Sequence, residues 1–585
     1  MSRQGWLVSL LVGCAATALA MRLQALIREV WQIRSLPERV MEWLLLFVPL
    51  GAFEYALQQF GANAKELALV GTVTGMATLL IVVGTLAVRA AWSAWRLLGL
   101  GLALWLLSML VVVPVTGGGL FATNLLLSPL LINAGFLMVF LAYSSVLILG
   151  RLRLKADVPE QRPLLPERRA LLAGLVGSIG ALGLARYAGR QGGMVTSNLP
   201  LASVRTRAST ITPTTPPTRA VVAAATMPPT RPPHALSTPT AIAIAADTPT
   251  PAPTVETLPA PADRVLQRSQ DGSLTAAGRP HGTLAPPITA NHDFYVVTKN
   301  AVADPVVDAA GWRLIIDGEV QNPVQVDYRT LRALPSVEVT KTLECISNFT
   351  AQCNLAAFGC DLISTARWRG ARLSDVLDLA GGLKQGVASL AFMSLDEFSA
   401  SLPPEIANDD EALVVYEMND EPLPREHGYP ARLLVPGRYG MKNPKWLAMI
   451  RALPRDFLGW YEQRNWNKDG FVKTMARIDV PGDGSLLAAG PQRVAGIAYA
   501  GTRGIDLVEF SANGGLTWTE AGLLEPPPGK DAMVRWEGSF RLDGGDNVTL
   551  VVRATDGEGE VQTSQFTLPQ PDGASGRHFV VVSAG

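Results

Sequence analysis

Histidine and cysteine are scarce in this chain, whose 585 residues include five histidines and four cysteines. No histidine precedes His234, so the apolar N-terminal third offers no imidazole as an axial haem ligand. No Cys-x-x-Cys-His sequence occurs, which excludes c-type haem attachment, and no Cys/His spacing matches a zinc site. The sequence therefore predicts no haem.

The chain also lacks an excess of charge, because 50 lysines and arginines balance 50 aspartates and glutamates. A neutral chain gives no electrostatic reason to expect a nucleic-acid partner. Its length favours several domains. Charge and hydrophobicity are segregated along the sequence, and we expect four regions: residues 1–190, 191–280, 281–462 and 463–585.

Apolar runs fill the first region, at about 6–21, 41–57, 66–88, 97–115, 128–149 and 170–186. Several are long enough to cross a bilayer that needs roughly 20 residues, so the pattern predicts an α-helical membrane bundle of about six spans. Positive residues concentrate in three connections: Arg22, Arg28, Arg34 and Arg39 in the first, Arg89 and Arg96 in the third, and Arg151, Arg153, Lys155, Arg162, Arg168 and Arg169 in the fifth. Since positive connections stay cytoplasmic, we expect both termini and everything after residue 186 on the outer, periplasmic side of the cytoplasmic membrane.

Glu54 is the one clear acid inside this bundle, whereas a transporter or proton path normally has several. The bundle is therefore interpreted as an anchor, or as a docking surface for a separate redox partner. Arg168-Arg169, before the last apolar run, resembles a twin-arginine export signal, with Glu167 in place of the usual hydroxyl residue. An ordinary pair of cytoplasmic positive charges is the equal alternative.

Residues 195–262 form a Pro/Thr/Ala tract with too little large apolar surface to bury, which predicts an extended, disordered stalk. From about 281 the composition becomes that of a folded domain. Trp312–Gly318 alternates like a strand and Leu373–Ala380 has helical spacing, so we expect an α+β domain. After about 465, short strands with turns at Asn513-Gly514 and Asp556-Gly557 predict an immunoglobulin-like β-sandwich.

Cys345 has three interpretations: a buried structural thiol, a disulfide partner in an oxidising compartment, or a metal-ligating thiolate. Cys353 and Cys360 are close in sequence and could pair with each other, which would leave Cys345 free. Downstream of Cys345 come His427, Arg432 and Lys445, which are residues that bind phosphate. A soft thiolate with such cations would suit a metal carried on a phosphorylated organic cofactor.

The outer part of the chain, about residues 285–585, resembles the sulfite oxidase family of molybdenum-cofactor oxidoreductases. The resemblance rests on several stretches in family order: Asn291-His-Asp-Phe-Tyr295, Trp312-Arg-Leu-Ile-Ile-Asp-Gly318, Thr342-Leu-Glu-Cys-Ile-Ser-Asn348, Asp361–Trp368, Tyr416–Asn419, Pro424–Arg432, Val435–Gly440, Lys445-Trp446 and Val508–Trp518. The trailing sandwich corresponds to that family's dimerisation domain, which implies that a homodimer is compatible with the sequence.

The resemblance implies a role for each candidate site residue. Cys345 would be the only protein ligand to molybdenum, beside the sulfurs of the molybdopterin. Asn291, Phe294 and Tyr295 would pack against the pterin, and Asp396 or Ser394 would contact it. The phosphate end of the cofactor would be bound by His427, Arg432 and the turn Asn443-Pro444-Lys445.

Two departures from the family concern the substrate. Val297 stands where a sulfite oxidase has an arginine for the sulfite dianion, and Ile346-Ser-Asn-Phe-Thr replaces basic residues after Cys345. A pocket without these guanidinium groups loses its charge-assisted contacts to sulfite. The loop Asn348–Gly359 is also longer than usual, which would reshape the rim of the pocket.

We therefore expect a membrane-anchored oxidoreductase that transfers an oxygen atom to or from a small-molecule oxo acceptor or donor, and that is sulfite-oxidase-like without being a true sulfite oxidase. Electrons would pass to or from a separate carrier, either a cytochrome or a quinone-linked membrane protein, because no second redox motif occurs. A reductase of the methionine sulfoxide type is the alternative for the same site. An alternative from another class is a cofactor-free surface scaffold or adhesin.

Overall fold

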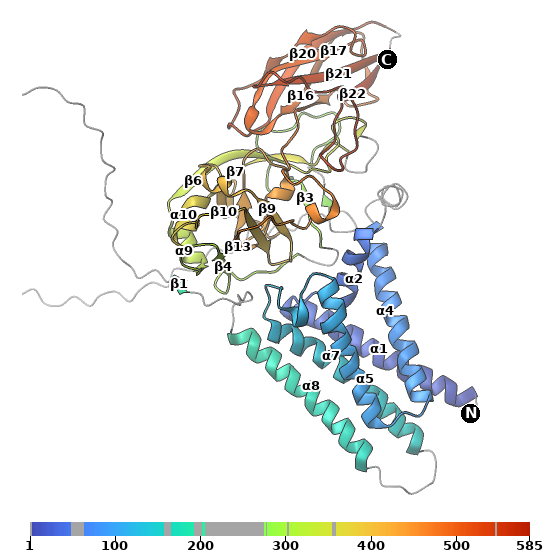
Figure 1. The fold of residues 1–585 in the computed structure, drawn as a ribbon. Helices are drawn as coiled ribbons and strands as arrows, with labels where there is room; N and C mark the ends of the chain where they lie inside the picture. Colours follow the sequence, from blue (N-terminus) through green and yellow to red (C-terminus); the bar gives the residue numbers. More distant parts are fainter. Residues whose placement is uncertain are drawn as a thin grey trace, which may run out of the picture.

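The structure is a computed structural model, and it describes residues 3–47, 64–156, 165–191, 202–204, 274–275, 278–300, 304–353, 359–544 and 547–585. Figure 1 shows a helical bundle, a β-rich domain that lies against one end of it, and a second pair of β-sheets beyond that domain. The stalk predicted at 195–262 falls almost wholly outside the described residues. Its strand β1 (Ala202–Val204) pairs with the edge of the middle domain.

The bundle contains long apolar helices: α1 (Arg3–Trp31), α4 (Ala64–Arg89), α5 (Ala94–Leu107), α7 (Pro129–Ala156) and α8 (Leu165–Gln191). A turn of π-helix at Ser108–Val112 and the short α6 (Val113–Val115) continue α5. Four segments are long and apolar enough to cross a membrane: 5–31, 67–89, 94–115 and 129–153. The apolar part of α8, 169–185, is shorter. Of the predicted run 41–57, residues 48–57 lie outside the described part of the chain, Glu54 included.

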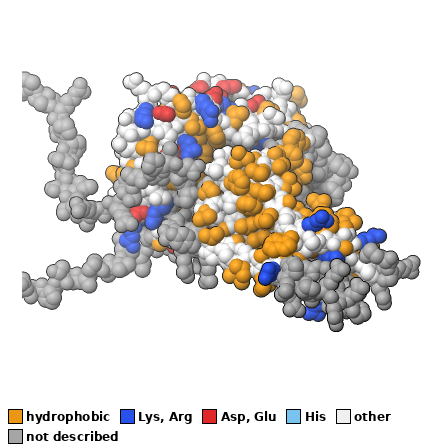
Figure 2. Space-filling model, turned by 60° about the horizontal axis from the view of Figure 1, so that its bottom comes forward, with side chains coloured by type: hydrophobic (Ala, Val, Ile, Leu, Met, Phe, Trp, Pro, Cys, Tyr) orange, Lys and Arg blue, Asp and Glu red, His pale blue; other side chains and the backbone are white. Residues whose placement is uncertain are grey.

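The outer faces of these helices are apolar. Figure 2 shows hydrophobic side chains gathered over the bundle with lysines and arginines at the margin. On α8, for example, Leu172, Val176 and Ile179 are all at least 60% exposed. A continuous apolar surface on helices of this length is typical of segments that can cross a lipid bilayer.

The connection after α1 lies against the β-rich domain. Short helix α2 (Leu36–Leu44) begins at a capping box formed by Ser35 and Glu38, and a single 3₁₀ turn (Leu45–Phe47) follows it. Arg39 donates to Glu397 of the domain at 2.5 Å, and the amide of Val306 donates to Gln32 at 3.2 Å. The prediction that this connection lies on the opposite side of the bundle from the catalytic domain is therefore wrong.

The physical reason is charge compensation within the first connection. Arg28 pairs with Glu38 at 3.4 Å, Arg34 pairs with Glu42, and Arg39 pairs with Glu397. Arginines that are buried in ion pairs do not act as free positive charges, so their number says little about which side they occupy. A 29-residue helix is about 43 Å long, so the Arg3 end of α1 lies at the far end of the bundle from the domain (Figure 1).

A second contact joins the bundle to the domain. Leu126, in the uncharged connection between α6 and α7, packs with Ile315, Ala448 and Met449 of the domain in one buried cluster. The first contact is ionic and the second is apolar, and they come from different connections of the bundle. Together they fix one end of the bundle against the β-rich domain.

The β-rich domain contains two sheets. One has the order β1-β5-β4-β13-β8-β9, and the other has the order β11-β10-β7-β6 with β12 paired to β10. Their bounds are β4 Arg313–Gly318, β5 Val324–Asp327, β6 Ser336–Glu344, β7 Ile363–Arg372, β8 Ser389–Ser394, β9 Ser399–Leu402, β10 Leu413–Met418, β11 Glu421–Pro422, β12 Arg432–Leu434 and β13 Leu447–Leu453. A third pairing joins β2 (Leu274–Thr275) to β3 (Val296–Val297).

The helices described in this domain are short, α9 (Tyr328–Ala333) and α10 (Leu373–Asp378). The predicted strand at 312–318 and the predicted helix at 373–380 are both present. Gly381 and Gly382 have φ of 76° and 81°, a conformation that glycine adopts easily and that ends α10. The α+β expectation holds for the strands, whereas the helical part is small.

Two further sheets, of orders β14-β16-β20-β19 and β15-β22-β21-β17-β18, occupy the C-terminal part. Their bounds are β14 Met475–Val480, β15 Leu486–Leu487, β16 Gly490–Tyr499, β17 Ile505–Ser511, β18 Thr519–Glu520, β19 Gly522–Leu523, β20 Val534–Leu542, β21 Asn547–Asp556 and β22 Phe579–Ala584. Trp536 of one sheet and Phe510 of the other are buried in the same core, so the sheets pack face to face. Lys341 of β6 and Asp531 form a buried ion pair at 2.6 Å that joins this part to the domain before it.

Candidate active site

Cys345 follows the last residue of β6, where the strand delivers its side chain into a buried pocket. Its amide donates to the carbonyl of Leu362 at 2.9 Å, and its carbonyl accepts from Asn348 at 2.9 Å, so the main chain is held on both sides. The thiol is 8% exposed and lines the pocket. Burial raises its pKa to about 11. A thiol with no disulfide partner in such a place is either structural or a metal ligand.

Aromatic side chains form the walls of this pocket. The rings of Phe294 and Tyr295 are stacked with centroids 5.4 Å apart, and Phe294 also meets the edge of His427 at 5.2 Å. Sequence reasoning found this pair, but it missed Trp446 and Tyr461, which line the same space. Trp446 directly follows the predicted Asn443-Pro444-Lys445 turn. This adjacency in the sequence was the signal that could have placed Trp446 in the pocket.

One end of the pocket is cationic, with His427, Arg432 and Lys445 together in its lining. Arg432 donates to the carbonyls of His427 at 3.1 Å and Asn443 at 3.0 Å, while its Nε makes no hydrogen bond within the described structure. Burial lowers the pKa of Arg432 to about 10. Burial, together with the charges of Lys445 and Arg432, lowers the pKa of His427 to about 3.

The guanidinium of Arg432 is bonded to neutral groups. Among the described residues Arg432 has no carboxylate partner, since it donates to the main-chain carbonyls of His427 and Asn443. A buried guanidinium without a counter-charge is unfavourable unless an anion binds beside it. The cationic end is therefore suited to a phosphate group.

The side chain of Asn443 holds the turn Asn443-Pro444-Lys445 in place. Its side-chain oxygen accepts from the amide of Val435 at 2.7 Å, and its amide group donates to the carbonyl of Tyr439 at 3.0 Å. Asn443, Pro444 and Lys445 all line the pocket, as predicted. The side chain of Asn443 is committed to these internal bonds, so it positions the turn.

The other predicted residues divide into two groups. Asp396 lines the pocket, whereas Ser394 is fully buried outside the lining. The side chain of Asn291 is also outside the lining and bonds Met418, Asn419 and Glu421. Its carbonyl lies 3.2 Å from Nε2 of His427, so Asn291 positions the histidine through its main chain.

The pocket contains about 750 Å³ of space between atoms, its open mouth included. A buried thiol, aromatic walls and the basic side chains of His427, Arg432 and Lys445 lie in one pocket, and these are the kinds of group that a molybdopterin would need. The residues present therefore fit this cofactor. Val297 also lines the pocket, and Arg432 is the only arginine in the lining of the described residues. The loss of a sulfite-binding guanidinium at Val297 stays a prediction.

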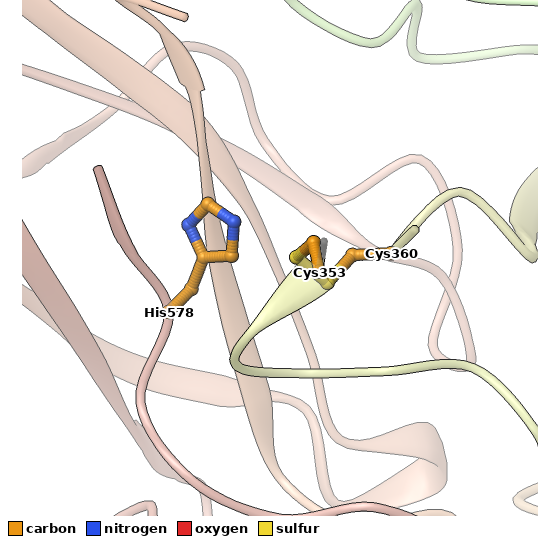
Figure 3. A group of neighbouring side chains, drawn as sticks. All are labelled: Cys353, Cys360 and His578. Atoms are coloured by element: carbon orange, nitrogen blue, oxygen red, sulfur yellow. A yellow bond between two sulfur atoms is a disulfide. The ribbon is translucent and has the colours of Figure 1, made fainter. Parts of the chain in front are cut away.

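Cys353 and Cys360 form a disulfide, as the sequence suggested, and this leaves Cys345 as a free thiol. Figure 3 shows His578 beside this disulfide, and the three potential ligand atoms lie within 4.8 Å of one another. Both sulfurs are bonded to each other, and Nδ1 of His578 accepts from the amide of Ile478 at 3.2 Å. This group is therefore a cross-link in the oxidised protein, and it offers no thiolate to a metal.

Comparison with known proteins agrees with the pocket. The oxidoreductase molybdopterin binding domain family matches residues 301–461. Mitochondrial sulfite oxidase of Macaca fascicularis is 33% identical over 313 residues, which are 46% of this chain and 57% of that protein. Sulfite oxidase of Gallus gallus is 30% identical over 313 residues, 47% of this chain and 68% of that protein.

The chain spans about half the length of the mammalian sulfite oxidases that it matches. Among solved structures, the sulfane dehydrogenase SoxCD from Paracoccus pantotrophus has a TM-score of 0.44 and 24% sequence identity, with 50% of this chain and 82% of that chain covered.

Proposed function

The chain belongs to the sulfite oxidase family of molybdenum-cofactor oxidoreductases, and we propose that it is a membrane-anchored enzyme that transfers oxygen atoms outside the cytoplasmic membrane. The observation that carries this proposal is the placing of the buried Cys345 thiol in one pocket with the basic side chains of His427, Arg432 and Lys445. The family is one of oxidoreductases, which favours this reading over a cofactor-free scaffold.

Each part of the pocket has a distinct role in this proposal. Molybdenum on its pterin supplies two-electron oxygen-atom transfer when bound. Cys345 would hold the metal, and Phe294 with Tyr295 would pack against the pterin and exclude water. Arg432 and Lys445 would bind the phosphate end, and His427 would contact it as a neutral ring, since its pKa of about 3 keeps it uncharged.

The pocket favours an uncharged oxo compound over sulfite. Val297 gives an apolar surface at the position where the family places a cation for the sulfite dianion. Without a guanidinium there, a dianion would lose its hydration and gain no bidentate charge-assisted contact at that position. Reduction of a sulfoxide of the methionine sulfoxide type is therefore the second candidate function for this site.

For the remainder of the chain we propose residues 1–190 as the membrane anchor, 191–280 as the linker, 281–462 as the catalytic domain and 463–585 as an immunoglobulin-like, dimerisation-type sandwich. The positive residues Arg89, Arg96, Arg151 and Arg153 lie in connections at the end of the bundle away from the catalytic domain, which supports an outer location for that domain. On this orientation the Arg3 end of α1 is cytoplasmic. Arg168-Arg169 would serve export, and a separate cytochrome or quinone-linked protein would carry electrons.

Metal analysis and turnover assays test the proposal. Protein purified from the membrane fraction should contain molybdenum, and replacement Cys345→Ala should remove it. Turnover is then measured in two assays, with sulfite plus an electron acceptor and with methionine sulfoxide plus an electron donor. Correctly inserted protein that contains no molybdenum would refute the function, and faster turnover of sulfite would refute the preference for an uncharged oxo compound.

A further inference from the structure

Lys299 is a cation of the pocket that sequence reasoning did not find. Its side chain is 2% exposed and lines the same cavity as Cys345. Its Nζ makes no hydrogen bond within the described structure, although it could donate three. Buried ammonium groups normally find acceptors, so an unused donor that borders a pocket indicates a ligand with an acceptor atom.

The nearest negative charge to Lys299 comes from the membrane region. Oε1 of Glu42, on α2, lies 3.7 Å from Nζ of Lys299. Glu42 is held there by Arg34, which also approaches Glu397 of the catalytic domain at 3.9 Å. A connection between two membrane helices thus reaches the pocket and supplies the counter-charge of one of its cations.

The charges around Lys299 nearly cancel. The groups that act on it are Arg34, Glu42, Asp396 and Glu397, and Arg39 also pairs with Glu397, so three cations, Lys299 included, face three carboxylates. Burial and the charge of Arg34 lower the pKa of Lys299, while the carboxylates oppose this change. An incoming oxyanion would approach an ammonium whose charge is already compensated, and it would also meet Asp396 in the pocket lining. An uncharged S=O or N=O oxygen would accept a hydrogen bond without that repulsion.

We propose that Lys299 donates a hydrogen bond to the oxygen of an uncharged oxo substrate, and that Glu42 makes the pocket select against oxyanions. This inference rests on the proposed oxidoreductase function and names the substrate class of the same site. Lys299 contacts the substrate in this proposal, and Glu42 is a positioning residue that acts through it. The membrane region then takes part in substrate selection as well as anchoring.

Binding of sulfate, an unreactive oxyanion, to the molybdenum-loaded full-length enzyme tests the pair by calorimetry. Glu42→Gln should tighten sulfate binding by about tenfold, because a unit negative charge within a few ångströms of the site is removed. Lys299→Met should weaken it, and it should raise KM for a neutral sulfoxide with a smaller change in kcat. Lys299→Arg should have a KM for the sulfoxide between those of the unaltered protein and Lys299→Met. If Lys299 and Glu42 were purely structural, Glu42→Gln and Lys299→Met would change the sulfate affinity in the same direction.

Glu38→Gln is the matched control, because Glu38 lies on the same helix, pairs with Arg28, and keeps its capping role as glutamine. Its sulfate affinity should equal that of the unaltered protein. If Glu42→Gln alone fails to fold, Glu42→Met removes the same charge with a side chain of similar length and should still tighten sulfate binding. Equal sulfate affinity in the unaltered protein and these Glu42 variants would overturn the inference. Molybdenum content, measured on each preparation, reports separately on the proposed function.

Discussion

Replacing Arg432 by methionine separates the cost of a buried charge from its use in binding. Burial holds the pKa of Arg432 at about 10 instead of 12.5, which corresponds to about 3 kcal/mol against the charged form. Its two hydrogen bonds to the carbonyls of His427 and Asn443 offset this, at roughly 1.5–3 kcal/mol each for a charged donor. Methionine removes the charge penalty and both bonds, so the free energy of unfolding of the cofactor-free protein should change by only about 1–3 kcal/mol.

The cofactor-loaded protein should respond far more strongly. A lost charge-assisted bond to the phosphate is worth roughly 1.5–3 kcal/mol, which weakens cofactor binding about 10- to 150-fold. The assay follows release of molybdenum from diluted protein over time, together with the unfolding of loaded and cofactor-free samples. Arg432→Lys keeps the charge with a different donor geometry. Its rate of molybdenum release should therefore fall between that of the unaltered protein and that of Arg432→Met.

Two results would refute this reasoning. Molybdenum release from Arg432→Met at the rate of the unaltered protein would show that the cationic end does not bind the cofactor. Equal destabilisation of the loaded and cofactor-free forms would show that Arg432 is purely structural.

Three further predictions concern the structure around the site. Glu397→Gln removes the buried interface partner of Arg39 and should increase hydrogen exchange in residues 32–44; unchanged exchange there would show that the ion pair does not hold α2 in place. The double variant Cys353→Ala/Cys360→Ala should lower the free energy of unfolding by about 2–3 kcal/mol, as expected for a cross-link that closes a short loop, and should leave molybdenum content unchanged; loss of the metal would place this disulfide in the site. Burial lowers the pKa of His578 to about 4, below its value of about 6.5 in the unfolded chain, so its contribution to stability is complete above pH 6.5 and is lost as the pH falls toward 4. His578→Asn should therefore flatten the fall in stability between pH 7 and pH 5, by about 2 kcal/mol, in unfolding measured at both pH values; an unaltered slope would contradict the buried neutral state.

The motif residues could be predicted because they lie in short stretches of sequence with recognisable residue types. Cys345 lies at a strand end, and the basic residues His427, Arg432 and Lys445 lie close together along the chain. The side chain of Asn291 was predicted to pack against the pterin but lies outside the pocket lining, and the reason is physical. Its neighbours Phe294 and Tyr295 face the pocket, whereas its own side chain finds partners on the other side of the chain, at Met418 and Glu421.

Lys299 and the orientation of the first connection could not be read from the sequence, because each depends on a distant partner. Lys299 looks like an ordinary surface lysine until Glu42 is brought beside it. Arg34 and Arg39 look like cytoplasmic charges until Glu42 and Glu397 neutralise them. Periodicity and charge counting describe single segments, and they do not reveal which ion pairs tertiary packing will form.

X-ray absorption at the molybdenum edge tests the central claim most directly, because it counts the sulfur atoms around the metal in the unaltered protein and in Cys345→Ser. The account predicts that the variant has one sulfur fewer in the first coordination shell of molybdenum, replaced by oxygen or nitrogen. An identical sulfur count in the two proteins would show that Cys345 is not the ligand, and would contradict the placing of the metal in this pocket.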